Sequence, residues 1–585
     1  MYLVLSYFIR HNLSIEAVTD LLKMLNVIFG SRCLPETYYG FSNAFKFNEY
    51  VKHFCCSVCH YYFEDIEETS ACPCCAGEKK VYFITLPIKN QLQAVIQKYQ
   101  DEINTVKSKR STGILSDIHT GRILKDDDEH MLSISFSVDG VSTANSNAKK
   151  SMWPIVSVIN DLPIEQRFAR KNMIVSGIWL SEKSPPMAVF LKAFTQELNH
   201  LFSAGLKING ITFKFRVAAV IADVPGKSKI LNSTQFNGRF GCSYCYHPGT
   251  KISNNQIRYS HKNSIFFEDR THDEQIFAMV EAHTTGTPVQ GLKGLSPVVA
   301  LNNFDVVKQI PIDYMHNCLL GVTKTLLTLW TDSKYHKKKW YLGNIRRKTV
   351  LNTRYSNICG FNEVSRAPRN VFEIAKLKAN ELQDWLLYYS IGYLAGILPE
   401  KYLNHFSLFR AAITKLLSNT NRNEDLIGIK EKLVQFVTEF EKLYGVKFMT
   451  INIHLLLHLS AQISNFGPLW TVSMFCFEDF YGYLKGLIKG PNGPIIQIVR
   501  KYSLMKSCHF SFNTQLSPKA IQYYSNIFKT SRSAQYTNKK KIEICHNGLT
   551  SKCYSLKHIY IRGIQYKCVT HNTKKKRRLC DIIFC

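Results

Sequence analysis

The sequence is short of acidic residues and contains no long apolar run. Asp and Glu number 44 against 74 Lys and Arg, so the 585-residue chain carries a formal charge of +30. This excess of base favours a polyanionic partner, and nucleic acid is expected ahead of an anionic membrane surface. The most apolar uncharged run, residues 385–398, is shorter than the roughly 20 residues that a bilayer-spanning helix needs. No membrane partner is therefore expected.

Features of a secreted protein are also missing. The opening segment MYLVLSYFIRHN has neither a basic region before its apolar residues nor a small-residue cleavage site. The 18 cysteines are too sparse in a chain of this length to form a disulfide framework. Several are instead spaced two residues apart, which in a reducing compartment indicates zinc. We therefore expect an intracellular protein.

One cysteine pattern predicts a structural zinc site. Its spacing is C-x2-C-x12-C-x2-C, and its members are Cys56, Cys59, Cys72 and Cys75. Two such pairs, separated by a hairpin-length segment, can close a tetrahedral thiolate site as in zinc ribbons. Cys55 and Cys74 stand beside these residues, so the choice within each pair stays open.

The chain is long enough for three or four domains. We expect an N-terminal helical segment over 1–50, a zinc ribbon over 51–80, a helical linker over 81–130, the first part of an α/β core over 131–254, a helical insertion over 255–470, the closing helix of the core over 471–510 and a basic, β-rich segment over 511–585. Within the core, residues 131–141 and 211–225 have the pattern of strands, and residues 187–205 that of a helix. This order is compatible with an RNase H-like core, although it fits many α/β folds.

Three acidic residues are candidates for catalysis. Asp139 and Asp223 each close a strand-like run, and Glu478 opens an amphipathic segment. Carboxylates are the ligands that hold hard divalent cations, and two such ions can bridge the attacking and leaving oxygens of a phosphate. Strand ends hold such ligands rigidly. A turn, a strand terminator and a solvated helix acid are the alternative interpretations.

The order of several motifs resembles one family. The series is SVDG, MWPI, NDLP followed by Arg167 and Asn172, a strand ending ADVP, GRFGCSYCYHPG, IPIDYMHNCLLGVTKTLLTLW, NIHLLLHL and LWTVSMFCFEDFYGYLKGLIKG. It is similar to the transposases of the CACTA (En/Spm) group of cut-and-paste DNA transposons, over roughly residues 131–500. The resemblance implies an α/β fold: an RNase H-like catalytic core interrupted by a large all-α insertion, with a small N-terminal zinc ribbon and a C-terminal β-rich basic segment.

The same resemblance implies a DDE acid triad. Asp139 matches the first acid, Asp223 the second and Glu478 the third, with Asp479 as a competitor for the third place. These acids are expected to hold two Mg²⁺ or Mn²⁺ ions. The implied reaction is hydrolysis at transposon ends, followed by attack of the freed 3′-hydroxyl on target DNA. Double-stranded DNA, a homo-oligomer in the DNA complex and a nuclear location are the corresponding expectations.

A second cysteine pair, Cys242 and Cys245, follows the second acid. One such pair cannot complete a four-ligand zinc site. The family pattern supplies His316 as the candidate third ligand, from the element Asp313-x2-His316. His454 and His458, four residues apart, are a second candidate pair, with buried core imidazoles as the alternative. His316 can also be interpreted as ordering DNA near the active site.

Several basic residues are candidates for contacts to DNA. They are Lys337, Lys338, Lys339, Arg346 and Arg347, interleaved with Trp340 and Tyr341, together with Lys485, which lies seven residues beyond Glu478. A solvated helical face is the alternative interpretation. The run KKKRR at 574–578 is a candidate nuclear localisation signal or phosphate-binding tail.

Two other functions compete with the transposase hypothesis. One is a domesticated transposase-derived protein that binds DNA or chromatin without cutting it. The other is a zinc-stabilised protein-interaction scaffold. The presence of all three acids argues against obvious decay of the site, and the order of the motifs argues against the scaffold.

Overall fold

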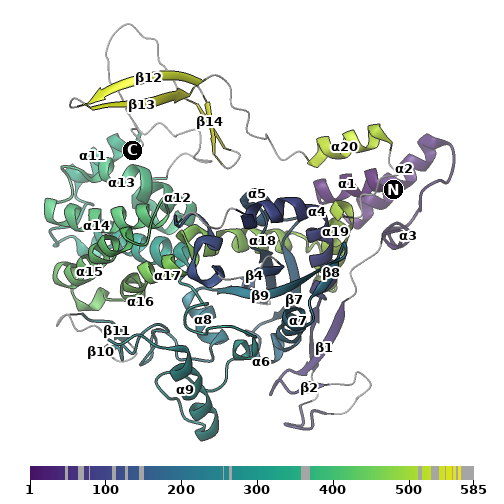
Figure 1. Ribbon diagram of the computed structural model, residues 1–585, viewed down its shortest axis with the longest axis horizontal. Coiled ribbons are helices and arrows are strands. Elements are labelled where there is room, and N and C mark those ends of the chain that lie inside the picture. The colour runs from purple at the N-terminus through teal and green to yellow at the C-terminus, as the bar shows by residue number, and fades with distance from the viewer. Residues whose placement is uncertain are drawn as a thin grey trace.

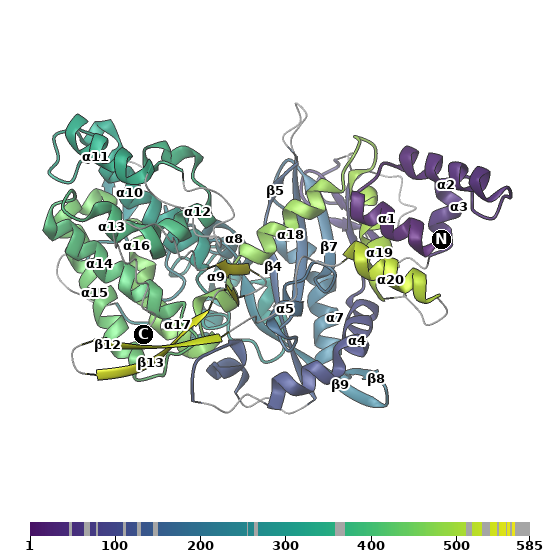
Figure 2. The same cartoon turned by 90° about the horizontal axis from the view of Figure 1, so that it is seen from above.

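The computed structural model is a mixed α/β structure with one large sheet and many helices (Figure 1). It describes residues 1–45, 50–63, 71–77, 80–108, 113–125, 130–143, 150–253, 256–261, 267–356, 369–510, 517–528, 539–546, 549–556, 558–561 and 564–567. The large sheet and a mainly helical region lie side by side in both views (Figures 1 and 2). Asp313 and the second cysteine pair each form contacts between these two parts.

The centre of the sheet is built from four strands. They are β7 (Ile174–Ser181), β6 (Ser151–Ile159), β4 (Met131–Val138) and β9 (Ile211–Ile221), adjacent in that order. β9 runs parallel to β4, whereas the β4–β6 and β6–β7 pairs are antiparallel. The strands predicted around residues 131–141 and 211–225 are thus confirmed.

The register of the parallel pair decides where the two aspartates lie. Ser137 of β4 is paired with Ile221 of β9. Two residues further along each strand come Asp139 and Asp223, so both leave the sheet at the same edge. Parallel strands lie about 4.8 Å apart, which brings the two positions together.

The cysteine-rich segment belongs to this same sheet. β3 (Lys80–Thr85) pairs with β7, β1 (Val51–Cys56) pairs with β3, and β2 (Tyr62–Phe63) pairs with β1. At the other side of the sheet, β8 (Leu206–Ile208) pairs with β9. The short β5 (Val141–Ser142) pairs with the central strand β6, outside the main strand order. Lys80, the residue expected to end the zinc ribbon, therefore starts β3, which joins the ribbon to the core.

Two layers of helices cover the sheet. α4 (Ile88–Ser108), α6 (Met187–Phe190) and α7 (Lys192–Ser203) pack on one face, where they share a core with Ile134 and Phe136 of β4. α18 (Phe475–Gly486) and α19 (Pro494–Phe510) share a core with Val156 and Val158 of β6 on the other face. Side chains along a strand alternate between faces. α5 (Ile164–Arg167) lies in the connection from β6 to β7.

The region between α8 (Val224–Ile230) and α18 is mainly helical, as predicted. Its principal helices are α9 (His272–Thr285), α10 (Lys324–Thr331), α11 (Ile345–Ser356), α12 (Ala379–Asp384), α13 (Ser390–Leu394), α14 (Glu400–Leu416), α15 (Asp425–Tyr444), α16 (Ile451–Leu455) and α17 (Leu459–Phe466). A π-helical segment, η4 (Met315–Thr323), precedes α10, and β10 (Thr250–Ser253) and β11 (Gln256–Arg258) form a small hairpin. The helices from α10 to α17 enclose a separate apolar core around Trp330 and Phe406, whereas Ala278 and Met279 of α9 join the core of the sheet.

The two ends of the chain add smaller elements. α1 (Tyr2–His11) and α2 (Ile15–Phe29), the helical pair predicted within residues 1–50, are followed by α3 (Tyr38–Asn43), and α1 packs against α19 and α20 (Pro518–Phe528). Two hairpins follow α20, β12 (Lys539–His546) with β13 (Leu549–Leu556) and β14 (His558–Ile561) with β15 (Ile564–Lys567). The basic run 574–578 lies outside the described residues. None of the described helices is long and apolar enough to cross a bilayer.

Candidate functional site

The two aspartates lie at the shared edge of β4 and β9, each held by its own backbone contacts. The Asp139 carboxylate accepts a hydrogen bond from the Gly140 amide at 2.7 Å. The Asp223 carboxylate caps α8 and accepts from the Gly226 amide at 2.6 Å. A Cβ at Gly140 would come within 2.6 Å of the Trp153 ring, and one at Gly226 within 2.9 Å of Asp223 itself. Both glycines therefore allow the close packing that fixes the carboxylates.

The pKa of Asp139 is affected by both of the other predicted acids. Burial, followed by the charge of Asp223 and then that of Glu478, raises the pKa of Asp139 to about 7. The pKa of Glu478 is raised as well, mainly by burial, and the charges of Asp313 and Asp223 add to this effect. Like charges that oppose one another's ionisation are the sign of carboxylates sharing one site. This site favours the entry of cations.

A fourth acid, Asp313, organises the same region. Ile312 forms a parallel β-bridge with Ala222, so Asp313 emerges next to Asp223 at the same edge. The buried Asp313 carboxylate accepts from the amide of Met474 at 2.8 Å and from the amide and Nδ1 of His316 at 2.8 and 2.7 Å. Met474 immediately precedes α18. Asp313 thereby ties the start of η4 to the helix that carries Glu478.

His316 lies among the acids, away from the second cysteine pair. Burial opposes its charge, but the hydrogen bond with Asp313 and the charges of Asp313, Asp223 and Glu478 raise the pKa of His316 to about 9. The imidazole is therefore a cation at neutral pH, with Nδ1 donating to Asp313. The prediction that His316 completes a zinc site with the cysteines is wrong, because Asp313 holds it at the sheet edge.

Glu478 has two potential competitors as the third acid, and both are engaged elsewhere. Asp479 accepts two hydrogen bonds from Arg170, at 2.8 and 2.9 Å, in a half-exposed ion pair. Glu441 accepts from the hydroxyl of Ser260 and the amide of His261, both at 2.8 Å. The predicted apolar stripe of α18 is buried through Phe477, Phe480, Tyr481 and Leu484. Glu478 is thus the acid of α18 whose charge acts on Asp139.

The first cysteine group, called here the four-cysteine group, has the geometry of a thiolate metal site. Its members are those predicted, Cys56, Cys59, Cys72 and Cys75, whose sulfurs all lie within 4.8 Å of one another. The distances Cys56 Sγ–Cys75 Sγ and Cys59 Sγ–Cys72 Sγ are 3.5 and 3.4 Å. Sulfurs bound to one tetrahedral zinc at about 2.3 Å are separated by about 3.8 Å. The neighbouring Cys55 points into the core of the sheet instead, where burial raises its pKa to about 12. The four-cysteine group can therefore hold a metal such as zinc.

The second cysteine pair meets two histidines of the helical region, and together they form the Cys2His2 group. Cys245 Sγ lies 3.3 Å from Nε2 of His454, and Cys242 Sγ lies 3.7 Å from Nε2 of His458. All four ligand atoms lie within 4.8 Å of one another. Two thiols and two imidazoles are a standard zinc ligand set. The alternative pair considered from the sequence, and not His316, thus lies beside these cysteines.

A further trio, His247, His261 and His454, is close enough to hold an ion, but its hydrogen bonds assign other roles. Nδ1 of His247 accepts from the Gly249 amide, which leaves Nε2 to donate to the Ser260 carbonyl. Nε2 of His261 lies 3.0 Å from Nδ1 of His454. Since Nε2 of His454 faces Cys245, its Nδ1–H donates to His261, as metal-bound histidines donate to their outer partners. His454 therefore belongs to the Cys2His2 group, and His261 orients it.

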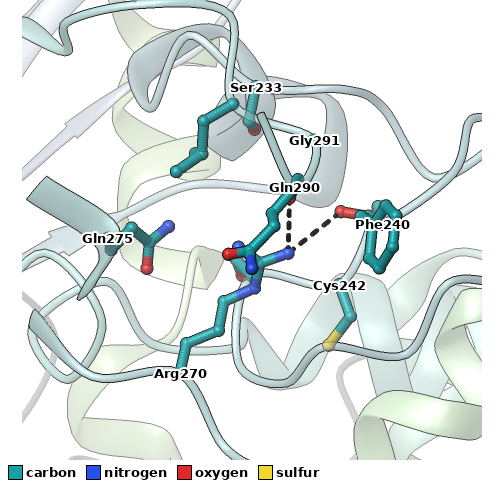
Figure 3. A pocket seen from close by; sticks show the side chains of 10 residues that line it. Ser233, Phe240, Cys242, Arg270, Gln275, Gln290 and Gly291 are labelled. Carbon is teal, nitrogen blue, oxygen red and sulfur yellow. Dashed lines mark hydrogen bonds between the residues drawn. The ribbon is translucent and has the colours of Figure 1, made fainter. Parts of the chain in front are cut away.

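A small cavity beside Cys242 contains a buried arginine (Figure 3). Arg270 donates to the backbone carbonyls of Cys245, Phe240 and Gln290. The cavity measures about 10 Å³, which is enough for one water molecule and too little for an organic substrate. Arg270 thus fixes the loop that presents the cysteines, and the cavity is not a substrate site.

The predicted basic residues of the helical region lie far from the acids. Lys337, Lys338, Lys339 and Arg346 are exposed, and α11 lies at the end of the helical region opposite the sheet (Figure 2). Arg347 donates to the carbonyls of Lys339 and Tyr341, so part of its role is structural. Trp340 is buried against Tyr402 and Tyr444, which leaves it unable to stack on a base. Lys485 is half-buried on α18, the helix that carries Glu478.

Two family models match the chain. One, described as a protein of unknown function (DUF1258), matches residues 42–284, and the other, a domain of unknown function (DUF4218), matches residues 416–540. No curated protein matches the chain. The first match contains Asp139, Asp223 and all the cysteines of the two groups, and the second contains His454, His458 and Glu478. The acids and the Cys2His2 group therefore each include residues from both matched regions, so the two regions meet in the folded chain.

Proposed function

We propose that this protein is a DDE-type DNA transposase that cleaves DNA at transposon ends and joins the freed 3′-hydroxyl to target DNA. One observation carries the proposal. Asp139 and Asp223 follow the ends of two neighbouring parallel strands, and the charge of Glu478, which lies on α18, raises the pKa of Asp139. The strand order β7-β6-β4-β9, with only the last pair parallel, supports an RNase H-like core. The formal charge of +30 suits a DNA substrate.

The donor set fits hard divalent cations. Three carboxylates, partly shielded from water and mutually repelling, are stabilised by cations and supply the oxygen ligands that Mg²⁺ and Mn²⁺ prefer. Asp139, Asp223 and Glu478 would hold two such ions. When bound, the ions would activate the attacking water or 3′-hydroxyl and stabilise the leaving oxygen.

The protein's own residues supply the rest of the chemistry. Asp313 holds His316 by Nδ1, so Nε2–H of the imidazolium is available to donate to a phosphate oxygen that reaches the acids. The Gly140 and Gly226 amides fix the aspartates, which limits their movement when charge changes. Zinc at the two cysteine groups would be structural, since four protein ligands leave no open position for substrate. Homo-oligomer formation on DNA and a nuclear location remain part of the proposal.

The test is a nicking and strand-transfer assay with DNA that carries the ends of the element encoding this chain. The wild-type protein is expected to nick and join this DNA with Mg²⁺ or Mn²⁺. Asp139→Asn, Asp223→Asn and Glu478→Gln should each remove activity while DNA binding is retained. Asp479→Asn and Glu441→Gln are the matched controls, because both acids are engaged away from the cluster.

Two results would contradict the proposal. Cleavage by the Asp139→Asn or Asp223→Asn variant at the wild-type rate would exclude this site. Tight DNA binding by the wild-type protein with no cleavage under any divalent metal would favour the domesticated, DNA-binding alternative.

A further inference from the structure

Three lysines lie around two aromatic rings where α4 meets the end of α19. The Nζ atoms of Lys98 and Lys506 lie 5.2 and 5.3 Å from the centre of the Phe510 ring. The Nζ atoms of Lys98 and Lys171 lie 5.9 and 5.7 Å from the centre of the Tyr99 ring. Lys98 thus shares one ring with Lys506 and the other with Lys171. Lys98 comes from α4, Lys171 precedes β7 and Lys506 belongs to α19, so the fold assembles a cluster that the sequence separates.

These ammonium groups have few partners of their own. An ammonium has three N–H donors. Among the described residues, Lys506 donates only to the carbonyl of Lys171 at 2.9 Å, and Lys98 only to the carbonyl of His509 at 3.0 Å. No ion pair joins any of the three lysines to a carboxylate in the described part of the chain, and residues 511–516 (SFNTQL) contain no acid. Most of the donor capacity of the cluster is therefore unused.

The electrostatic environment is correspondingly cationic. Burial lowers the pKa of Lys506 to about 7. Burial and then the charge of Lys171 lower the pKa of Lys98. Burial, together with the charges of Lys171, Lys98 and Lys506, lowers the pKa of His509 to about 3. Like charges held together in this way are relieved by an anion.

Two of the three lysines are accessible from solvent. Lys98 is exposed, Lys171 is half-buried and Lys506 is 6% exposed. The carbonyl of His509, at the C-terminal end of α19, explains the position of the Lys98 ammonium group. It does not explain why three lysines lie around the same two rings. Two accessible lysines beside a buried one form an anion site whose base is the buried ammonium group.

We infer that Lys98, Lys171 and Lys506 bind phosphates of the DNA backbone, as a contact separate from the acid cluster. The inference rests on the proposed function for its ligand. The position supports it: Arg170, next to Lys171, pairs with Asp479, which adjoins Glu478 on α18. A strand reaching the acids along this side would meet Arg170 and Lys171 before the cluster. Contacts of this kind position DNA without reading its sequence.

The experiment measures the salt dependence of binding to a short duplex of arbitrary sequence, without added divalent cation. The variant is Lys98→Gln with Lys171→Gln, both of which change accessible side chains. The slope of log K against log salt is expected to become less steep by about 0.9 for each phosphate that the variant no longer neutralises. Lys506→Met, which keeps the volume of the buried side chain, should reduce the slope further.

The matched control is Lys192→Gln with Lys214→Gln, which removes the same charge from exposed positions on α7 and β9. Its slope should equal that of the wild-type protein. Equal slopes for the two double variants would overturn the inference. It would also be overturned if inorganic phosphate stabilised the wild-type protein but not the cluster variant, while the two proteins had the same slope for DNA. The readout does not depend on cleavage, because Asp139→Asn should keep the wild-type slope. Failure of the proposed reaction is therefore distinguishable from failure of this site.

Discussion

The acid cluster and the Cys2His2 group lie in the same molecule and differ in almost every physical respect. At the sheet edge, carboxylates repel one another and the pKa of Asp139 is raised to about 7. At the Cys2His2 group, two thiols face two imidazoles, and an outer histidine orients one of them. In the first arrangement, the repulsion between the carboxylates is relieved only when cations enter. The second is closed by four protein ligands, and it joins the loop after the second aspartate to the helical region. Under the proposed function, the acid cluster is the reacting site, and the Cys2His2 group holds two parts of the fold together.

Removing the Cys2His2 ligands should have the largest effect on stability. Cys242→Ser with Cys245→Ser is expected to reduce the zinc content from two ions to one and to lower the free energy of unfolding by several kcal/mol, because metal binding contributes directly to folding. Elemental analysis and thermal unfolding measure the two effects. Cys33→Ser, an exposed cysteine outside both groups, is the control. An unchanged zinc count would show that this group does not bind the metal.

Removing ligands of the four-cysteine group should affect a smaller part of the molecule. Cys59→Ser with Cys72→Ser should also reduce the zinc count by one. The destabilisation should be concentrated in β1 and β2, which lie at the edge of the sheet. Hydrogen exchange is the appropriate measurement. Loss of protection throughout β4 and β9 would contradict this separation between edge and core.

The pH dependence of stability should distinguish the acid cluster from the zinc groups. Because the pKa of Asp139 is raised from 3.8 to about 7, the folded protein without divalent cations binds this proton more tightly than the unfolded chain does. Stability should therefore fall as pH rises from about 4 to 7. In Asp139→Asn this part of the fall should be absent, whereas Asp479→Asn should behave like the wild-type protein.

A divalent cation should reverse this effect. Added Mn²⁺ is expected to stabilise the wild-type protein most at and above pH 7, where Asp139 is ionised, and to stabilise Asp139→Asn much less. Thermal unfolding across pH, with and without Mn²⁺, measures both differences. Equal stabilisation of the two proteins would place the manganese ions elsewhere.

The smallest effect is expected at His261, which contacts a zinc ligand and not the zinc. His261→Phe should weaken zinc binding by about 10–100-fold through loss of the hydrogen bond to His454. His261→Gln, which keeps an acceptor, should restore part of the affinity. Competition with a chelator measures the constant, and the absorption spectrum of the cobalt-substituted protein reports ligand geometry. An unchanged affinity in both variants would assign His261 a packing role only.

Local patterns in the sequence predict the parts of the molecule that are built from neighbouring residues. The four-cysteine group lies within 20 residues of chain, and both aspartates end strands that alternation and composition identify. The partners of Cys242 and Cys245 lie more than 200 residues away, and spacing alone does not specify which of the candidate histidines reaches them. Asp313 is a similar case, because its hydrogen bond to Met474 exists only once η4 and α18 meet at the sheet edge. The lysine cluster at Phe510 was missed for the same reason, since its members are ordinary basic residues within their own segments.

The central claim is that the acid cluster binds hard cations while the two cysteine groups bind zinc. Anomalous diffraction from crystals soaked in Mn²⁺, recorded at the manganese and zinc absorption edges, tests it most directly. We expect manganese peaks among Asp139, Asp223 and Glu478 and one zinc peak in each cysteine group. A manganese peak at Asp479 or Glu441, or none near Asp139 and Asp223, would contradict it.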